Sequence, residues 1–346
     1  MAELSLSILS WNLYLGADVS RVIGVDSMLL PGRVAAVWET VNRTDFRSRA
    51  KKIAGAICRE RPDVIALQEV CRWSSLHRRP LNERAIPETV EYDFLETLLG
   101  ELNARGEIYF TAARSRGIDV LLPAANGPDI RLEDSLVLLL RAGRGHKGLR
   151  WAKPQTGRFA ANLRTTLDGE PFEIKRGWTS VDLVAGEQQV RIINTHLEYF
   201  SSAVQPAQLS EILNGPGSIP GAVILTGDFN AHPGSATWQM LKSSGYVDAW
   251  ETAGGGPGHT SGRTEDLRNQ QPALKERIDW IMCRGGMEVL QTSLIGSELS
   301  DRTPEGMWPS DHAGLCARVL LRADVLQSGL REQSSMRQPG ELIEVV

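Results

Sequence analysis

Residues 222–230 read AVILTGDFN, an apolar run that ends in a glycine, a carboxylate and an amide. A short apolar run of this kind is typical of a strand that is buried on both faces of a sheet. Such a strand can present a polar side chain only where it ends, so Asp228 and Asn230 are expected at a sheet edge. The stretch therefore predicts a strand end available for chemistry, although Gly227–Asn230 alone also reads as an ordinary turn.

The same arrangement recurs at five other predicted strands, over residues 4–9, 64–67, 189–194, 278–282 and 315–321. The polar residues at their ends are Asn12, Glu69, Asn194-Thr195-His196, Asp279 and Asp311-His312. Several such ends pooled at one edge would form a preorganised site. Carboxylate and amide oxygens without cysteine suit a hard octahedral cation, Mg²⁺ or Mn²⁺. Two histidines beside acids suit proton transfer near neutral pH.

Each of these residues has an ordinary structural explanation when taken singly. Asp279 could be a surface charge on an edge strand, His196 a core histidine with satisfied hydrogen bonds, and Asp311-His312 a helix cap. The joint pattern favours a site, because residue types and strand contexts agree at all six places.

The composition limits the class of protein. With 346 residues, 42% of them hydrophobic and 23% charged, the chain is globular and long enough for one large domain or two. A net charge of −4 argues against binding by wholesale neutralisation of a nucleic-acid backbone, while a local basic groove stays possible. Four scattered cysteines predict free thiols, and no basic leader or long apolar run is present. We therefore expect a cytoplasmic protein without a transmembrane segment, secreted only if a signal peptide has been removed.

The remaining patterns predict alternating helices and strands in a single domain over 1–323, followed by a flexible tail over 324–346. Apolar spacing predicts helices over 44–61, 94–102, 207–213 and 237–243. Further strands are expected over 136–140 and 178–184, the latter in a hairpin with 189–194. A surface excursion over 74–87 and a loop over 254–271 are the irregular parts.

Six segments, in this order along the chain, resemble motifs of the endonuclease/exonuclease/phosphatase superfamily. They are Ser10-Trp11-Asn12, Leu67-Gln68-Glu69, Asn194-Thr195-His196-Leu197, Gly227-Asp228-Phe229-Asn230, Arg277-Ile278-Asp279-Trp280 and Ser310-Asp311-His312. The superfamily includes pancreatic-type deoxyribonucleases, apurinic endonucleases, neutral sphingomyelinases and inositol polyphosphate 5-phosphatases. The resemblance, which covers about residues 4–321, implies an α/β fold: a four-layer α/β sandwich of two packed mixed β-sheets flanked by helices. It also implies metal-dependent hydrolysis of phosphate esters.

The resemblance implies a metal site centred on Glu69, which matches the family's principal metal carboxylate. Asn12 lies beside it in the pattern, and Asp311 would complete the shell around Mg²⁺ or Mn²⁺. A cation there would offset the charge that builds in the transition state.

For proton transfer, the same resemblance makes His312 the general base and Asp279 the group that holds its other ring nitrogen. Asp228 and Asn230 match the residues that position the nucleophile and the phosphoryl oxygens. His196 matches the second family histidine, a phosphate contact or proton donor.

Two further residues have weaker support. The position of Asp134, ahead of the strand over 135–140, resembles that of the carboxylate partner of His196 in the deoxyribonuclease branch. Arg176, before the strand over 178–184, could clamp phosphate through its fork of donors. The alternatives are a strand-edge charge for Asp134 and an unpaired surface arginine for Arg176.

Four functions remain open at this point. The first is a phosphodiesterase acting on a small or lipid-like phosphodiester, with Trp73, Trp151 and Trp308 lining the mouth of its site. The second is a nuclease acting on DNA or RNA, against which we note Leu132 where an aromatic residue is expected and only short arginine-rich patches. The third is a phosphomonoesterase, and the fourth a non-catalytic binding protein on the same fold. In the first three the partner is the phosphate ester itself, and no obligatory protein partner is evident.

Overall fold

The computed structural model describes residues 4–77, 88–142, 149–186, 188–271 and 274–321. The predicted tail, 324–346, and most of the predicted excursion over 74–87 lie outside these residues. Within the described segments, no helix has the length and apolar character needed to cross a membrane.

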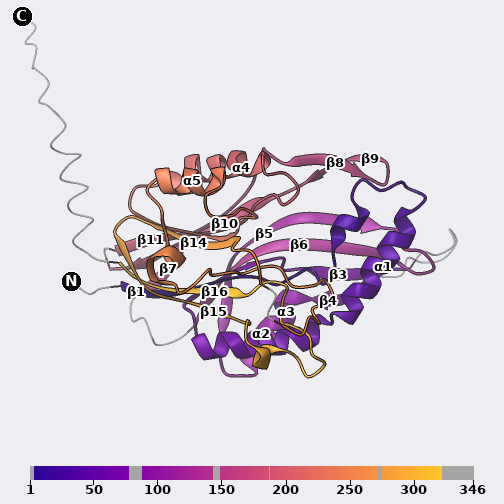
Figure 1. Ribbon diagram of the computed structural model, residues 1–346, viewed down its shortest axis with the longest axis horizontal. Helices are drawn as coiled ribbons and strands as arrows, with labels where there is room; N and C mark the ends of the chain where they lie inside the picture. Colours follow the sequence, from indigo (N-terminus) through magenta and orange to yellow (C-terminus); the bar gives the residue numbers. More distant parts are fainter. Residues whose placement is uncertain (1–3, 78–87, 143–148, 187, 272–273, 322–346) are drawn as a thin grey trace, which may run out of the picture.

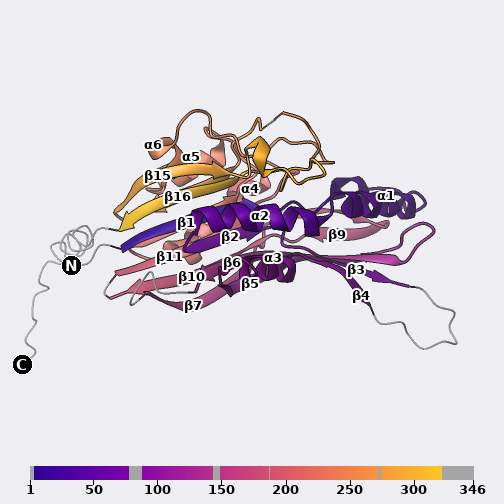
Figure 2. The ribbon, with the colours of Figure 1, turned by 90° about the horizontal axis from the view of Figure 1, so that it is seen from below.

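Two mixed β-sheets pack face to face with helices on their outer sides (Figures 1 and 2), so the predicted four-layer sandwich is confirmed. Sheet A has the order β15-β16-β1-β2-β6-β3-β4, and β5 also pairs with β6. Its strands are β1 (Leu4–Asn12), β2 (Val64–Gln68), β3 (Arg72–Leu76), β4 (Thr89–Asp93), β5 (Tyr109–Leu122), β6 (Asp129–Arg141), β15 (Met287–Ile295) and β16 (Gly314–Leu321).

Sheet B has the order β13-β14-β12-β11-β10-β7. Its strands are β7 (Leu149–Arg158), β10 (Gly177–Ala185), β11 (Gln188–His196), β12 (Ala222–Asp228), β13 (Val247–Asp248) and β14 (Asp279–Arg284). The predicted hairpin is the antiparallel pair β10–β11.

The central strands are apolar on both faces because both faces are buried. In β12, Val223 and Leu225 pack with the helices outside sheet B, whereas Ala222 and Ile224 face the core between the sheets. This alternation follows from the two-residue period of a strand. Each buried face is stabilised by about 25 cal/mol per Å² of apolar surface removed from water. A polar side chain is therefore tolerated mainly where such a strand ends.

Helix α2 (Phe46–Glu60) confirms the prediction for 44–61. Asp45 caps its start by accepting the backbone N–H of Arg47, and the helix ends at Arg61, whose φ is 50°. Pro62 then prevents continuation. Sheet A is covered by α2 together with α3 (Phe94–Asn103), and sheet B by α4 (Val204–Asn214) and α5 (Ala236–Ser243). A short helix, α6 (Ala249–Ala253), follows β13.

The structure contains elements that the sequence patterns did not predict. Helix α1 (Leu30–Arg43) has no side chain capping its start, so the usual signal for a helix is missing there. A separate hairpin, β8 (Leu163–Leu167) and β9 (Glu170–Ile174), lies between β7 and β10 in the sequence. Three short 3₁₀ helices complete the described elements: η1 (Val19–Val22), η2 (Pro216–Ser218) and η3 (Leu299–Asp301).

Candidate active site

One row of cross-strand neighbours crosses sheet B at the edge where the polar residues gather. Gly177, His196, Asp228 and Asp279 are successive register partners on β10, β11, β12 and β14. Arg176 directly precedes Gly177. Four adjacent strands therefore bring Arg176, His196, Asp228 and Asp279 to one line.

The glycine in the AVILTGDFN stretch allows two of these strands to approach closely. Gly227 has a φ of 142°, and a Cβ atom there would lie 2.0 Å from the carbonyl oxygen of Thr195. Only glycine fits such an approach. Just beyond, Asn230 adopts a φ of 49°, and its backbone N–H donates to Asp228 Oδ1 at 3.0 Å. The turn thereby fixes the Asp228 carboxylate.

A pair of buried amides joins the two sheets beneath the site. Gln68 Nε2 donates to Asn194 Oδ1 at 2.7 Å, and Asn194 Nδ2 donates to the carbonyl oxygens of Leu67 and Val137 at 2.9 and 3.1 Å. Both amides are fully buried. These bonds hold the ends of β2 and β11 together. Both residues belong to the quoted motifs, but the sequence did not predict this contact between the sheets.

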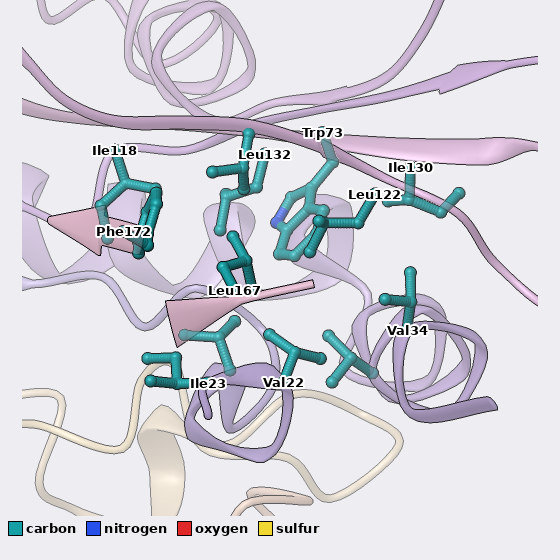
Figure 3. Close-up of a pocket in the computed structure, with 13 residues that line it drawn as sticks. Val22, Ile23, Val34, Trp73, Ile118, Leu122, Ile130, Leu132, Leu167 and Phe172 are labelled. Atoms are coloured by element: carbon teal, nitrogen blue, oxygen red, sulfur yellow. The ribbon is translucent and has the colours of Figure 1, made fainter. Parts of the chain in front are cut away.

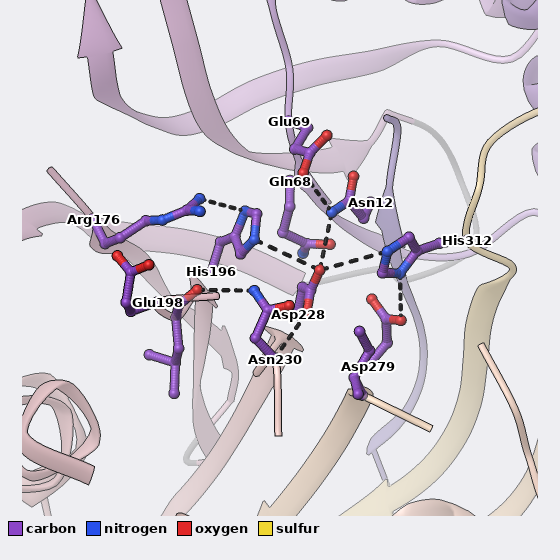
Figure 4. A network of polar contacts seen from close by, with 12 residues as sticks. Asn12, Gln68, Glu69, Arg176, His196, Glu198, Asp228, Asn230, Asp279 and His312 are labelled. Carbon is purple, nitrogen blue, oxygen red and sulfur yellow. Dashed lines mark hydrogen bonds and ion pairs between the residues drawn. The ribbon is translucent and has the colours of Figure 1, made fainter. Parts of the chain in front are cut away.

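Asn12 holds two carboxylates in place (Figure 4). Its Nδ2 donates to Glu69 Oε1 and to Asp228 Oδ2, both at 3.0 Å, while its Oδ1 accepts the backbone N–H of Tyr14 at 2.9 Å. The amide oxygen keeps a second lone pair, so the prediction of Asn12 as a metal ligand stays open to test. In this arrangement Asn12 orients Glu69 and Asp228.

Glu69 and Asp311 are the carboxylates that fit a hard cation. Glu69 has a φ of 55°, a strained conformation for a residue with a side chain, and such strain is concentrated at functional sites. Burial and the negative charge of Asp311 raise the pKa of Glu69 to about 8. Both side chains are half-buried, and carboxylate oxygens are the ligands that Mg²⁺ or Mn²⁺ prefers. The residues present therefore fit such a cation.

His312 is oriented by Asp279. Its Nδ1 lies 2.7 Å from Asp279 Oδ2, and its Nε2 lies 3.8 Å from Asp228 Oδ2. Burial opposes the charged imidazolium, but Asp279, Asp311 and Asp228 outweigh it and raise the pKa of His312 well above its ordinary value. The hydrogen bond to Asp279 leaves Nε2 as the nitrogen that faces the site.

His196 faces Asp228 from the other side. Arg176 Nη1 lies 3.0 Å from His196 Nδ1, and His196 Nε2 lies 3.6 Å from Asp228 Oδ2 (Figure 4). Because a guanidinium can only donate, Nδ1 must accept, and the ring proton must be on Nε2. Burial and the charge of Arg176 lower the pKa of His196 well below its ordinary value. His196 is therefore a neutral donor aimed at the site.

The structure corrects the expectation for Asp134. It lies inside β6 and not ahead of a strand, and the side chain that contacts His196 Nδ1 is that of Arg176. The Asp134 carboxylate instead accepts from Cys71 Sγ at 3.9 Å. Burial raises its pKa, and the charge of Arg176 opposes that rise. Among the described residues, no hydrogen bond links Asp134 to His196.

A second grouping of possible metal ligands exists. One ligand atom each from Asp228, Asp279 and His312 lies within 4.8 Å of the others, with all three residues buried. Burial and then Asp279 raise the pKa of Asp228 to about 6. Because Asp279 already accepts the bond from His312, this grouping is better suited to proton transfer than to holding a cation.

Two buried arginines support the site, and sequence reasoning missed both. Arg49 of α2 is fully buried and donates to the carbonyl oxygens of Leu13, Tyr14 and Pro309 at 2.7, 3.2 and 2.9 Å. Arg263 donates to the carbonyl oxygen of His312 at 3.1 Å. A signal was present for Arg49, which falls on the apolar stripe of its helix, where a solvated arginine is not expected.

The tryptophans are not arranged as predicted. Trp308 is fully buried and Trp73 is 3% exposed, so neither presents its ring at an open mouth. Trp151 is 41% exposed but stacks near Phe110, with ring centroids 5.7 Å apart, on strand β7 at the edge of sheet B. The predicted free cysteines are confirmed.

Comparison with known protein families decides the class. The model of the Endonuclease/Exonuclease/phosphatase family matches residues 9–312. The chain belongs to this family. Its members are metal-dependent phosphoesterases or nucleases. The match begins in β1 and ends at His312, so it includes every site residue discussed above.

Solved structures of the endonuclease/exonuclease/phosphatase family resemble this chain in fold. A protein from Bacteroides thetaiotaomicron is 15% identical, with a TM-score of 0.58, over 93% of this chain and 100% of that one. A protein from Beutenbergia cavernae is 19% identical, with a TM-score of 0.55, over 92% and 72%. Humanized D. rerio TDP2 is 19% identical, with a TM-score of 0.52, over 91% and 98%. No curated protein matches the chain.

Proposed function

We propose that this protein is a Mg²⁺-dependent phosphodiesterase in which His312 is the general base. The observation that carries the proposal is the 3.8 Å separation between His312 Nε2 and Asp228 Oδ2, with Asp279 on the opposite nitrogen of the ring. A water molecule beside this pair, within hydrogen-bond reach of both atoms, can donate one proton to each. That placement prepares the water for attack on phosphorus.

The other charged side chains of the site and His196 also have roles in the proposal. Glu69 and Asp311 would hold the cation, which supplies Lewis-acid stabilisation of the charge on the phosphoryl oxygens. His196 donates its Nε2–H to a phosphoryl oxygen, and Arg176 keeps it in that tautomer. Asp279 stabilises the imidazolium that forms when His312 takes the proton.

The charge of the site favours a diester. Within the described residues, Arg176 is the one cationic side chain that bonds to a side chain of the site, while Glu69, Asp228, Asp279 and Asp311 are acidic. A phosphodiester carries one negative charge per phosphate, whereas a phosphomonoester dianion or a long polyanion would need more positive charge around it. Phosphodiesters of small or lipid-like alcohols therefore suit the site better than nucleic acid.

The test is a substrate panel with the full-length protein: bis-p-nitrophenyl phosphate, p-nitrophenyl phosphate, plasmid DNA and RNA, each with Mg²⁺, Mn²⁺, Ca²⁺ or EDTA. We expect cleavage of bis-p-nitrophenyl phosphate with Mg²⁺ or Mn²⁺, and loss of that cleavage with EDTA and in Glu69→Gln. Exposed His77, which directly follows β3, provides a matched control for His312→Ala as His77→Ala.

Other outcomes would replace the proposal. Phosphate release from p-nitrophenyl phosphate without diester cleavage would indicate a phosphomonoesterase. Preferred cleavage of plasmid or RNA would indicate a nuclease. Activity that survives both Glu69→Gln and His312→Ala would belong to another site or a contaminant, and would leave a binding role for this fold.

A further inference from the structure

An apolar cavity lies between strands of sheet A and the segment that contains η1 and α1 (Figure 3). It is partly open to solvent, and the space in it that water-sized groups can occupy is about 50 Å³. Its walls come from β3, β5 and β6 on one side and from η1 and α1 on the other. The hairpin β8–β9 closes it with Leu167 and Phe172.

The walls of the cavity offer no hydrogen bonds to an occupant. Every lining side chain is hydrocarbon except the indole of Trp73, and Trp73 Nε1 already donates to the carbonyl oxygen of Leu15 at 2.9 Å. A polar occupant would lose its hydrogen bonds to water without replacement. A hydrocarbon occupant would bind favourably, because protein interiors seldom leave voids of this size unfilled.

The cavity and the metal carboxylate share one residue. The backbone N–H of Leu15 donates to Glu69 Oε2 at 2.7 Å, and its carbonyl accepts from Trp73 on the cavity wall. Since one residue spans at most ~3.6 Å, Glu69 Oε2 and Trp73 Nε1 are no more than about 9 Å apart.

The hairpin that closes the cavity also reaches the site. Its base is fixed by the backbone N–H of Arg176, which donates to Asn162 Oδ1 at 3.0 Å, and Arg176 contacts His196. At its other end, the carbonyl of Thr166 accepts the backbone N–H of Gly24, which follows η1, at 2.9 Å. The hairpin is thus connected both to Arg176, at the candidate active site, and to the wall of the cavity.

We propose that this cavity binds one aliphatic chain of the phosphodiester substrate, so that the natural substrate is a lipid phosphodiester. The inference rests on the proposed function of the neighbouring site. A methylene is about the size of a water molecule, which needs ~10–15 Å³ of such space, so the cavity holds about three to five methylenes of one chain. The chain leaves the cavity near Leu15, and the phosphate to which it is esterified lies at Glu69 and His196.

The chain offers a matched pair of variants on one strand. Val120 of β5 lines the cavity, and Leu121, the next residue, is 46% exposed and is not among the lining residues. Neighbouring strand residues point to opposite faces. Val120→Trp should fill the cavity, whereas Leu121→Trp adds the same ring outside it.

The experiment measures kcat/KM for p-nitrophenyl esters of methyl, butyl, octyl and dodecyl phosphate with Mg²⁺, and for bis-p-nitrophenyl phosphate. We expect kcat/KM to rise about two- to fourfold per methylene over the first part of the series, because burial of a methylene changes a binding constant by up to about fourfold. Val120→Trp should abolish the rise and keep the rate on the methyl ester. Leu121→Trp should keep both.

A binding measurement decides the inference independently of turnover. With EDTA present, dodecylphosphocholine below its micelle concentration should raise the melting temperature of the wild-type protein and of Leu121→Trp, but not that of Val120→Trp. A flat chain-length series and no shift, with bis-p-nitrophenyl phosphate cleaved, would overturn the cavity's role and leave the phosphodiesterase. A shift that Val120→Trp removes, with no diester cleaved, would support the chain site and overturn the proposed reaction.

Discussion

The pairing of Asp279 with His312 makes a prediction that a double-mutant cycle can test. Asp279 reaches the reaction only through the 2.7 Å contact between its Oδ2 and His312 Nδ1, and its Oδ1 has no hydrogen-bond partner among the described residues. Asp279→Asn therefore removes the charge behind the imidazole. The amide can still rotate its oxygen toward Nδ1, because no neighbour holds the other position.

The size of each loss follows from the role of each residue. A hydrogen bond to a charged group contributes about 1.5–3 kcal/mol, so Asp279→Asn should lower kcat about 10- to 150-fold. Removing the base itself with His312→Ala should lower kcat about 10²- to 10⁴-fold. Once the imidazole is gone, Asp279 has nothing left to orient, and the double variant should be no slower than His312→Ala alone.

The assay is Mg²⁺-dependent release of p-nitrophenol from bis-p-nitrophenyl phosphate under saturating substrate, with urea unfolding to confirm that each variant is folded. The sign of the pH effect is a further readout. His312 must be neutral to act, so activity falls below its pKa, and loss of the Asp279 charge lowers that pKa. The acidic limb of the profile should therefore move to lower pH in Asp279→Asn. Losses that multiply in the double variant would refute the pairing, as would a larger loss for Asp279→Asn than for His312→Ala.

Three other variants test separate parts of the site and core. Arg176→Met should lower kcat/KM about 10- to 100-fold, because a charged hydrogen bond is lost and His196 is free to change tautomer; equal kinetics would show that Arg176 is only a surface charge. Glu69→Gln should remove the rise in melting temperature that Mn²⁺ gives the wild-type protein, and a retained rise would place the cation elsewhere. Burial raises the pKa of Cys283 to about 12, so the unfolded thiol ionises first and stability falls as pH rises above ~9, by about 1.4 kcal/mol per pH unit for this group. Cys283→Ala should reduce that slope in urea unfolding between pH ~9 and ~11, and an unchanged slope would contradict the assignment.

The place of the candidate site could be predicted from the sequence because the direction of each strand decides at which edge of the sheet its last residue lies. β1 and β2 are parallel, as are β11 and β12, so their carboxyl ends, with Asn12, Glu69, His196 and Asp228, reach the same edge. β14 runs antiparallel to β12, so its first residue, Asp279, arrives there instead of its last. Polar residues at the ends of apolar strands were thus sufficient to predict that these side chains lie at one edge.

The detailed pairing within the site could not be predicted in the same way. Asp134 and Arg176 both precede or occupy strands near His196, and strand order alone does not say which side chain reaches the ring. The strand register decides which side chain reaches the ring, because Arg176 directly precedes Gly177, the cross-strand partner of His196. Register depends on the packing of the whole sheet and has no local sequence signal here.

The apolar cavity was beyond sequence reasoning for a different reason. Its lining residues come from elements spread between η1 and β9, and each of them also reads as ordinary core. Most of those elements were not predicted: η1, α1, β3, β5 and the β8–β9 hairpin. A cavity forms where the packed side chains of several segments leave space, so no single segment of the sequence predicts it.

The backbone of Leu15 gives a reason to expect that the cavity affects the rate as well as the affinity. Its N–H and carbonyl are both engaged, with Glu69 on one side and Trp73 on the other, so a shift of the indole on chain binding displaces the residue that fixes the carboxylate. Arg49 limits how far the loop can move, since it is bonded to the carbonyls of Leu13 and Tyr14. If a bound aliphatic chain fixes the position of Trp73, and through Leu15 that of Glu69, short esters should show a lower kcat in addition to a higher KM. A series in which only KM changes would mean that the cavity contributes uniform binding and that the two sites are adjacent without being coupled.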